Sequence, residues 1–421
     1  MELKKQKLLT IIKNNKVLIE NLSYLSVIQV FNLLIPLITL PYLLMVLGNT
    51  NYGYIVYSHT IISYFLIFVN FGFNISATKE ISIYRNNKEK LNEIVSSVLI
   101  IKGVFFLVSS LIVLAFSLSL DDSNLKILLL LSLYICLYEW IFPIWYFQGV
   151  EKMKYITYIS LLSKTFFLIF IFIFIKSKSD FLKVPIINGL GSILGGGFSL
   201  YLVFNKENIS FKFQKIKTIK YYLKESFILF LGNIAGKIKI LSNKAILGLY
   251  LGMDILAIYD IADKLKDVFI LFLQLIVQVL FPSIVRSKNN IKVRKTIKLV
   301  FFTGILVYLM VYLTILICTH YFFVDYKEVS VIFLILGTLI ILQPLSYLIS
   351  TTVLLVNGYK KEYTFNLYIS AVSYLIFLFI CYIFEYITVY SLSISLVLSA
   401  LISIGAHVRV VLKKNKKDWI L

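Results

Sequence analysis

Residues 232–248 read GNIAGKIKILSNKAILG, and they place Lys237, Lys239 and Lys244 inside a longer apolar run. The run extends roughly from Tyr222 to Gly252, and a helix needs about 20 residues to cross a bilayer. A charge near the bilayer centre costs at least about 2.5–3.5 kcal/mol, so such residues usually face a bundle interior or an aqueous cavity. The segment therefore predicts a membrane protein with a polar interior.

The composition of the whole chain is that of a polytopic membrane protein. Of its 421 residues, 59% are hydrophobic, and the mean hydropathy is +0.88, whereas soluble domains are about 45–50% apolar. The net charge of +21 would suggest nucleic acid in a soluble protein. Here most basic residues lie in the linkers between apolar runs, as the positive-inside rule expects. We therefore expect no nucleic-acid partner.

The apolar segments predict an all-α integral membrane fold of about twelve transmembrane helices. The expected spans are 22–47, 53–76, 94–120, 125–148, 155–176, 182–204, 222–251, 255–285, 297–319, 328–356, 363–384 and 387–411. Lys and Arg concentrate at the two ends of the chain and in the linkers after even-numbered spans, which predicts that both termini are cytoplasmic. The linkers are too short to form a separate domain.

Two pairs of matching segments predict an internal duplication. LGNTNYGYIVYS, at the end of the first expected span, resembles LGMDILAIYDIA at the end of the seventh, which aligns Gly48 with Gly252. The dipeptide Gln148-Gly149, at the end of the fourth expected span, likewise matches the dipeptide Asn357-Gly358 at the end of the tenth. Because each half holds an even number of spans, the halves are predicted to be parallel repeats, as in many transporters. The two six-helix lobes would comprise residues 1–207 and 208–421.

Four prolines within the expected spans are candidate gating kinks. They are Pro36 and Pro41 in the first span, Pro143 in the fourth and Pro344 in the tenth. Proline removes a backbone hydrogen bond and kinks a helix, and neighbouring helices in a bundle can satisfy the freed carbonyl. Proline is common in transmembrane helices in general, so these positions are compatible with transport without being diagnostic of it.

The seventh and eighth expected spans carry facing charges. Helical geometry places Asn233, Lys237 and Lys244 on one face, with Lys239 near the opposite side. The charged stripe of the eighth span consists of Asp260, Asp263, Lys264 and Asp267. One interpretation is a structural ion-pair network, in which Asp260 and Lys264 pair within their helix and the lysines of the seventh span neutralise the aspartates.

The charges do not balance, which supports a second interpretation. Five lysines, counting Lys264 and Lys266, face three aspartates in these two spans, and elsewhere Lys102 and Lys164 accompany only Glu139. An excess of positive charge at membrane depth predicts an anionic substrate that carries phosphate or carboxylate. Lys237 is the first candidate for binding it, because it lies mid-span on the face of Asn233.

Enzyme signatures are absent from the sequence. There is no Walker loop, no HExxH and no GxSxG, the three histidines lie in distant spans, and the cysteines have no metal-ligand spacing. We therefore expect a protein that is not an enzyme and holds neither cofactor nor metal. Its driving force would be an ion gradient of H⁺ or Na⁺, or downstream consumption of its substrate.

Twelve spans in two halves, together with three segments, resemble the Wzx-type polysaccharide flippases of the MOP (multidrug/oligosaccharidyl-lipid/polysaccharide) exporter superfamily. The segments are LGNTNYGYIVYS, FPIWYFQGVEKMKYI and SNKAILGLYLGMDILAIYDIADKL. The resemblance covers nearly the whole chain. It implies a V-shaped pair of lobes around a central cationic cavity, in the bacterial inner membrane. It also implies that undecaprenyl-pyrophosphate-linked repeat units of O-antigen, lipopolysaccharide or capsule are flipped to the outer leaflet by alternating access.

The resemblance also implies roles for the charged residues and for partners. The cationic cavity would use Lys237, Lys244, Lys239, Asn233, Lys102 and Lys164, and the pairing or coupling network would use Asp260, Asp263, Lys264, Asp267 and Glu139. Relatives often carry an acid just before the position of Lys244, where this chain has Asn243, which puts a carried-over coupling role in doubt. Expected partners are membrane lipids, a polysaccharide polymerase and a chain-length regulator.

Other classes of membrane protein were weighed against this one. A multidrug exporter of the MATE type would favour an acidic cavity, and lipid II flippases usually carry extra spans. A polysaccharide polymerase needs a sizeable outer loop, which the short linkers exclude. A sugar porter of the major facilitator type would carry a basic signature loop that is absent from TKEISIYRNNKEKLNE.

Overall fold

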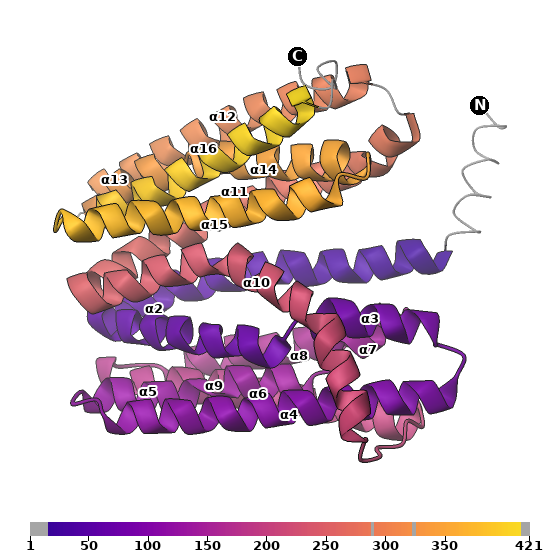
Figure 1. Ribbon diagram of the computed structural model, residues 1–421. Helices are drawn as coiled ribbons and strands as arrows, with labels where there is room; N and C mark the ends of the chain where they lie inside the picture. The colour runs from indigo at the N-terminus through magenta and orange to yellow at the C-terminus, as the bar shows by residue number, and fades with distance from the viewer. Residues whose placement is uncertain (1–15, 288–289, 322–325, 414–421) are drawn as a thin grey trace, which may run out of the picture. The chain divides into compact units, whose positions relative to one another are not determined.

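The computed structural model of the chain describes residues 16–287, 290–321 and 326–413, and within these ranges it is helical without a β-strand (Figure 1). The helices of the N-terminal part are α2 (Lys16–Asn70), α3 (Phe73–Ile83), α4 (Lys88–Leu118), α5 (Ser123–Ser132), α6 (Tyr134–Ile141), α7 (Ile144–Gly149), α8 (Met153–Phe174), η1 (Lys178–Leu182), α9 (Lys183–Tyr201) and η2 (Leu202–Lys206). The expectation of an all-α membrane fold is confirmed.

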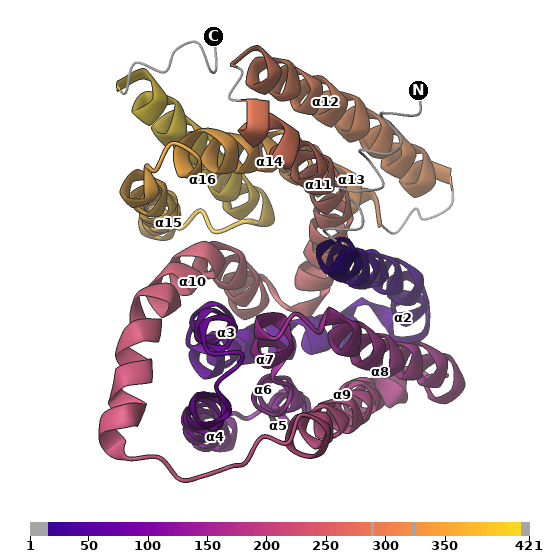
Figure 2. The ribbon, with the colours of Figure 1, turned by 90° about the vertical axis from the view of Figure 1, so that its right-hand side faces the viewer.

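The remaining helices begin with a long one that leads into the C-terminal part. They are α10 (Ile216–Leu251), α11 (Met253–Ser287), α12 (Asn290–Tyr321), α13 (Lys327–Leu336), α14 (Leu339–Ile349), η4 (Ser350–Leu355), α15 (Lys360–Ile383) and α16 (Val389–Lys413). In Figure 2, α8 lies along α9 and α15 lies along α16, and these two helix pairs make extensive contact.

The spans found in the structure agree with a multi-pass membrane protein. Among the described residues, nine helical segments are long and apolar enough to cross a membrane. The first, Ser23–Ile83, is 61 residues long and contains a non-helical break at Gly48, so it covers two expected spans. Helices α10 and α11, at 36 and 35 residues, cover the charged seventh and eighth expected spans and are not among these nine, so their crossing of the membrane stays a prediction. The total of twelve and the cytoplasmic termini remain predictions, and residues 1–15 and 414–421 lie outside the description.

The predicted repeat has a counterpart in the backbone. Gly48 breaks α2 with φ 77°, and Gly252 separates α10 from α11 with φ 90°. Both values lie in the left-handed region that a side chain with a Cβ rarely adopts. The aligned glycines therefore turn the chain between successive spans in the same way. The second pair differs, because Gly358 has φ 81° whereas the left-handed residue near Gly149 is Glu151.

The fourth and tenth expected spans are both broken helices. Pro143 follows α6 and caps α7, while Pro344 lies within α14, which continues into the π-helical η4. Pro143 lies in the break between α6 and α7, where its missing backbone N–H is tolerated, whereas α14 continues past Pro344 and η4 begins only at Ser350. Pro36 and Pro41 lie inside α2, where the helix continues through them.

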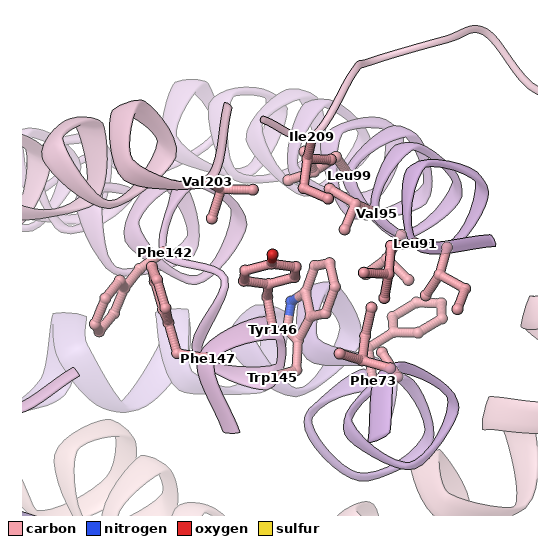
Figure 3. Close-up of a cluster of buried hydrophobic side chains, with 14 of the residues drawn as sticks. Phe73, Leu91, Val95, Leu99, Phe142, Trp145, Tyr146, Phe147, Val203 and Ile209 are labelled. Atoms are coloured by element: carbon pink, nitrogen blue, oxygen red, sulfur yellow. The ribbon is translucent and has the colours of Figure 1, made fainter. Parts of the chain in front are cut away.

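The core of the N-terminal unit gathers around α7. Trp145, Tyr146 and Phe147 are almost fully buried in one cluster with Phe73 of α3 and Val95 of α4. Figure 3 shows Trp145 on the side of Phe73 and Val95, and Phe147 beside Phe142. Gly149 makes this packing close, since a Cβ built there would lie 2.5 Å from the Cβ of Ile81. The aromatic residues 145–147 of α7 therefore pack α7, α3 and α4 into one hydrophobic cluster.

The chain divides into two compact units, Met1–Asn233 and Ile234–Leu421. The division falls within α10, after the expected lobe boundary at 207/208. The first half of α10 belongs to the N-terminal unit because Ser226 hydrogen-bonds Ser76 at 2.7 Å and Phe230 stacks on Phe71. The boundary of the sequence repeat itself remains a prediction.

Candidate functional site

Helices α10 and α11 of the C-terminal unit carry a network of buried ion pairs. The ammonium of Lys244 lies 2.6 Å from Asp260 and 2.9 Å from Asp263. Lys264 pairs with Asp260 at 2.9 Å, as its spacing predicted, and Lys266 pairs with Asp263 at 2.6 Å and with Asp267. The single turn at Gly252 makes the two helices adjacent, which brings these residues together.

This network is balanced internally, with three lysines and three aspartates. Asp260, Asp263 and Lys266 are at most 2% exposed, so each charge depends on its partners for stabilisation. The placement favours the structural interpretation for Lys244 and Lys264 over direct substrate binding.

Asn243, the residue before Lys244, takes part in a neutral bridge. Its amide nitrogen donates to the Tyr259 hydroxyl at 2.7 Å, and its carbonyl oxygen accepts from the Tyr374 hydroxyl at 3.0 Å. Asn243 is fully buried. The bridge joins α10 to α11 and α15 and leaves the neighbouring Lys244 free to pair with the aspartates.

Lys239 has different surroundings from Lys244, although it lies only five residues before it on α10. Its ammonium donates to the hydroxyl of Ser370 on α15 at 2.7 Å, and Ser370 in turn donates to the carbonyl of Ser399 on α16. Lys239 forms no ion pair in the part of the chain that the structure describes. It is therefore a partly buried cation without an acid.

Lys239 lines a polar cavity of about 260 Å³ within the C-terminal unit. Helices α10, α11, α14, α15 and α16 form its wall. Besides the charged Asp263 and Lys266, the polar lining residues are Gln274, Gln343, Ser346, Tyr347, Ser350, Tyr363, Ser370, Ser403 and His407. Most of these side chains can donate hydrogen bonds, so the cavity combines one uncompensated positive charge with many donors.

His407 is a further polar group in this wall. It is 2% exposed, its Nδ1 lies 3.3 Å from the Ser346 hydroxyl, and its Nε2 has no hydrogen-bond partner among the described residues. A buried ring nitrogen without a partner costs free energy unless a ligand or water satisfies it.

The other predicted site residues are dispersed. Lys237 is exposed and Asn233 is half-buried at the end of the N-terminal unit, and neither lines the cavity. Lys102 is fully buried and pairs with Glu139 at 2.7 Å, and Glu139 also accepts from Asn70. Lys164 hydrogen-bonds Asn32. The pairing with Glu139 favours a structural role for Lys102, and neither Lys102 nor Lys164 is among the residues that line the cavity of the C-terminal unit.

The sequence analysis missed the contribution of α15 and α16. Ser395, Ser399, Ser403 and His407 recur every four residues and are all buried. Such spacing forms a polar stripe along one helix face, and this signal could have indicated that α16 faces a polar interior.

Within the described residues there is no group of three or more His, Cys, Asp or Glu side chains that could hold a metal ion.

A multi-pass helical membrane protein with a charged, donor-rich interior is the architecture of a membrane transporter. The sequence profile of the polysaccharide biosynthesis protein family matches residues 18–288, more than half of the chain. The chain therefore belongs to that family. Over 352 residues it is 27% identical to "Putative O-antigen transporter" of Escherichia coli (strain K12), a match that covers 82% of this chain and 85% of the relative.

Solved structures share the fold. The lipid II flippase MurJ in an inward closed conformation matches with a TM-score of 0.73 at 18% identity, covering 94% of this chain and 88% of that one. An inward-facing multidrug resistance transporter of the MATE family and MOP superfamily matches with a TM-score of 0.72 at 14% identity, covering 94% and 99%. The resemblance to the MOP superfamily is confirmed, and the transporters among these matches agree with a protein that is not an enzyme.

Proposed function

We propose that this protein is a flippase that moves undecaprenyl-pyrophosphate-linked oligosaccharide repeat units from the inner to the outer leaflet of the bacterial inner membrane. Family membership, the relative named as an O-antigen transporter and the fold shared with a lipid II flippase support the proposal. The protein would work by alternating access, exposing its polar interior first to one side of the membrane and then to the other.

The observation that carries the proposal is the cation at Lys239. A lysine at membrane depth without an acid has a high free energy, and an anionic group on the substrate would lower it. A pyrophosphate offers several strong acceptor oxygens for charge-assisted hydrogen bonds. The hydroxyl and amide donors around Lys239 would replace water around the same group.

The size of the cavity restricts what binds there. Its volume of about 260 Å³ lies just below the about 300–1,000 Å³ typical of small-molecule sites. It can take a charged head of phosphate size, whereas an oligosaccharide would need a larger space. We therefore assign to this cavity the phosphate end of the substrate and leave the sugars outside it.

The proposal is tested by deleting the gene and restoring it with variants. Deletion should leave complete lipid-linked repeat units on the cytoplasmic face and remove surface glycan. Lys239→Met should fail to restore the glycan at normal protein level, and Lys239→Arg should restore part of it because the charge returns. Lys298→Gln is the matched control, since Lys298 is an exposed lysine of α12, and it should restore the glycan fully.

Several outcomes would contradict the proposal. Repeat units that reach the outer face without being polymerised would indicate a polymerase. A block in peptidoglycan synthesis would indicate a lipid II flippase, and altered drug sensitivity with normal glycan would indicate a multidrug exporter. Full activity of Lys239→Met together with loss of glycan in Lys237→Ala would move the substrate site to the exposed lysine favoured by the sequence.

A further inference from the structure

A second, basic cavity lies in the N-terminal unit, and its lining shares no residue with the cavity around Lys239. Its volume is about 380 Å³, and its lining includes Arg85, Lys88, Lys152, Glu207 and Tyr146. These residues come from the α3–α4 turn, from α7 and the turn that follows it, and from the segment after η2. Those three connections are linkers that the distribution of Lys and Arg predicts to be cytoplasmic.

The hydroxyl of Tyr146 is a neutral hydrogen-bonding group in the lining of this cavity. Tyr146 as a whole residue is only 1% exposed, and it lines the cavity together with the basic residues. Figure 3 shows the hydroxyl turned away from the aromatic cluster, toward the space between Val203 and Ile209. A ligand in the cavity can accept a hydrogen bond from this hydroxyl, in surroundings that exclude most water and therefore strengthen the bond.

Two long helices begin at this cavity. Helix α4 starts at Lys88, and α8 starts at Met153, directly after Lys152, which provides no side-chain cap. The first N–H groups of a helix point away from it and its N-terminus carries partial positive charge, which favours anions. The partial charge of the two helix starts adds to that of the basic side chains, while the Lys90 and Met153 N–H groups already donate to Asn87 and Asn21.

The side chains leave an excess of positive charge. Lys152 is occupied by Glu207, whose two oxygens lie 2.5 and 2.6 Å from its ammonium. Arg85 makes only an exposed contact of 3.4 Å with Glu151, and Lys88 is exposed. Three cations and one carboxylate in the lining favour an anion of low charge, such as a phosphodiester.

A third, apolar cavity is lined by residues of α4, α6, α9, η2 and the segment after η2. Its volume is about 530 Å³, and its lining includes Leu99, Leu107, Trp140, Phe204 and Phe211. On α4, Leu99 and Leu107 follow the basic cavity's Leu91 by about 12 and 24 Å, at 1.5 Å per residue.

The segment after η2 borders both cavities, through Ile209 in the first and Phe211 in the second. It is fixed on α4 because Ser210 and Lys212 donate from their backbone nitrogens to Asn92 and Ser96.

We propose that these two cavities together bind one anionic phospholipid of the inner leaflet. The phosphodiester contacts Arg85, Lys88 and the Tyr146 hydroxyl, and an acyl chain lies in the apolar cavity. The near end of the apolar cavity fits, because Leu99 lies about 12 Å from Leu91 along α4 and the hydrocarbon of one leaflet is about 15 Å thick. The two cavities are close neighbours at Ile209 and Phe211, and this favours a lipid over free phosphate. The bound lipid would stabilise the packing of the segment after η2 on α4. This inference does not depend on the proposed transport function.

Native mass spectrometry of the full chain, purified in mild detergent, tests the proposal with phosphatidylglycerol as the probe. One molecule of phosphatidylglycerol should bind to each protein, and it should bind more tightly than phosphatidylethanolamine does. Tyr146→Phe, which removes only the hydroxyl, should weaken binding roughly tenfold through the lost charge-assisted hydrogen bond. Arg85→Gln with Lys88→Gln should weaken it further. Val104→Trp, which fills the apolar cavity, should also weaken it, because Val104 is an exposed residue of that lining.

The control variant is Lys217→Gln with Lys220→Gln, which removes two exposed lysines outside both cavities and should leave binding unchanged. Equal weakening by this control would overturn the proposal in favour of diffuse surface charge. Competition by inorganic phosphate at equal concentration would overturn it in favour of a free-phosphate site. Binding of undecaprenyl phosphate in preference to phosphatidylglycerol would also overturn it, and would indicate a site for the substrate carrier.

Discussion

Lys102 in the N-terminal unit and Lys239 in the C-terminal unit are both lysines within membrane-spanning helices, yet their surroundings are opposite. Lys102 is fully buried and lies 2.7 Å from the carboxylate of Glu139. Lys239 keeps some exposure to its cavity and donates to a serine hydroxyl. A buried lysine with an acid contributes to structure, whereas one without an acid keeps its charge available to a ligand. The surroundings of a charge, more than its position in a span, therefore indicate its role.

The largest effect is expected where Lys102 loses its acid. Glu139→Ala leaves a fully buried ammonium uncompensated, which should lower the free energy of unfolding by about 3–5 kcal/mol. Thermal unfolding in detergent measures it. Lys102→Met combined with Glu139→Leu removes both charges and should recover most of the loss. A double variant as unstable as the single one would show that packing, and not pairing, makes this region stable.

The next effect comes from giving Lys239 the acid that it lacks. Ser370→Asp places a carboxylate beside the ammonium, which should neutralise the cation and lower transport at least about tenfold, or about 1.4 kcal/mol. Surface glycan in the complemented deletion strain is the measurement. Ser370→Asn is the uncharged control of similar size and should keep more activity. Equal activity of the two variants would contradict the role of the free charge.

A smaller effect is expected at the edge of the ion-pair network. The side chain of Lys264 is 38% exposed while it pairs with the buried Asp260, so water screens the lysine end of the pair, and a pair with such screening contributes about 1 kcal/mol. Lys264→Gln should therefore change the unfolding temperature little, because Lys244 still compensates Asp260. A loss as large as that of Glu139→Ala would mean that the network acts as one unit.

The smallest effect concerns an acid that meets neutral donors in place of a lysine. Asp122 lies in the turn before α5 and caps it by accepting from the backbone of Asn124 and Leu125. Burial alone would raise its pKa, but hydrogen bonds from Tyr54 and from these backbone groups lower it below its usual value. The stabilisation of about 1 kcal/mol should be present above about pH 4 and be lost as the pH falls further. Asp122→Ala should remove this pH dependence in thermal unfolding.

The charged residues show how far spacing predicts contacts. The pairing of Asp260 with Lys264 follows from their separation along one helix, and the tight turn at Gly252 predicted that the lysines of α10 meet the aspartates of α11. The choice between Lys237 and Lys239 could not be made this way. It depends on which face of α10 packs on α15, and that contact joins residues more than a hundred positions apart in the chain.

Hydropathy, charge distribution and repeated glycines established an all-helical, multi-pass membrane protein, because every backbone group in lipid must be satisfied within its own helix. These are local properties, and they can be read along the chain. The cavity around Lys239 and the basic cavity that includes Tyr146 are each formed by helices that are far apart along the chain. Whether a buried polar group there has a partner depends on side chains that only packing brings within hydrogen-bond distance. The tertiary structure therefore decided which groups a ligand can reach: among the described residues Lys239 has no acid beside it, and the Tyr146 hydroxyl lies in the lining of the basic cavity.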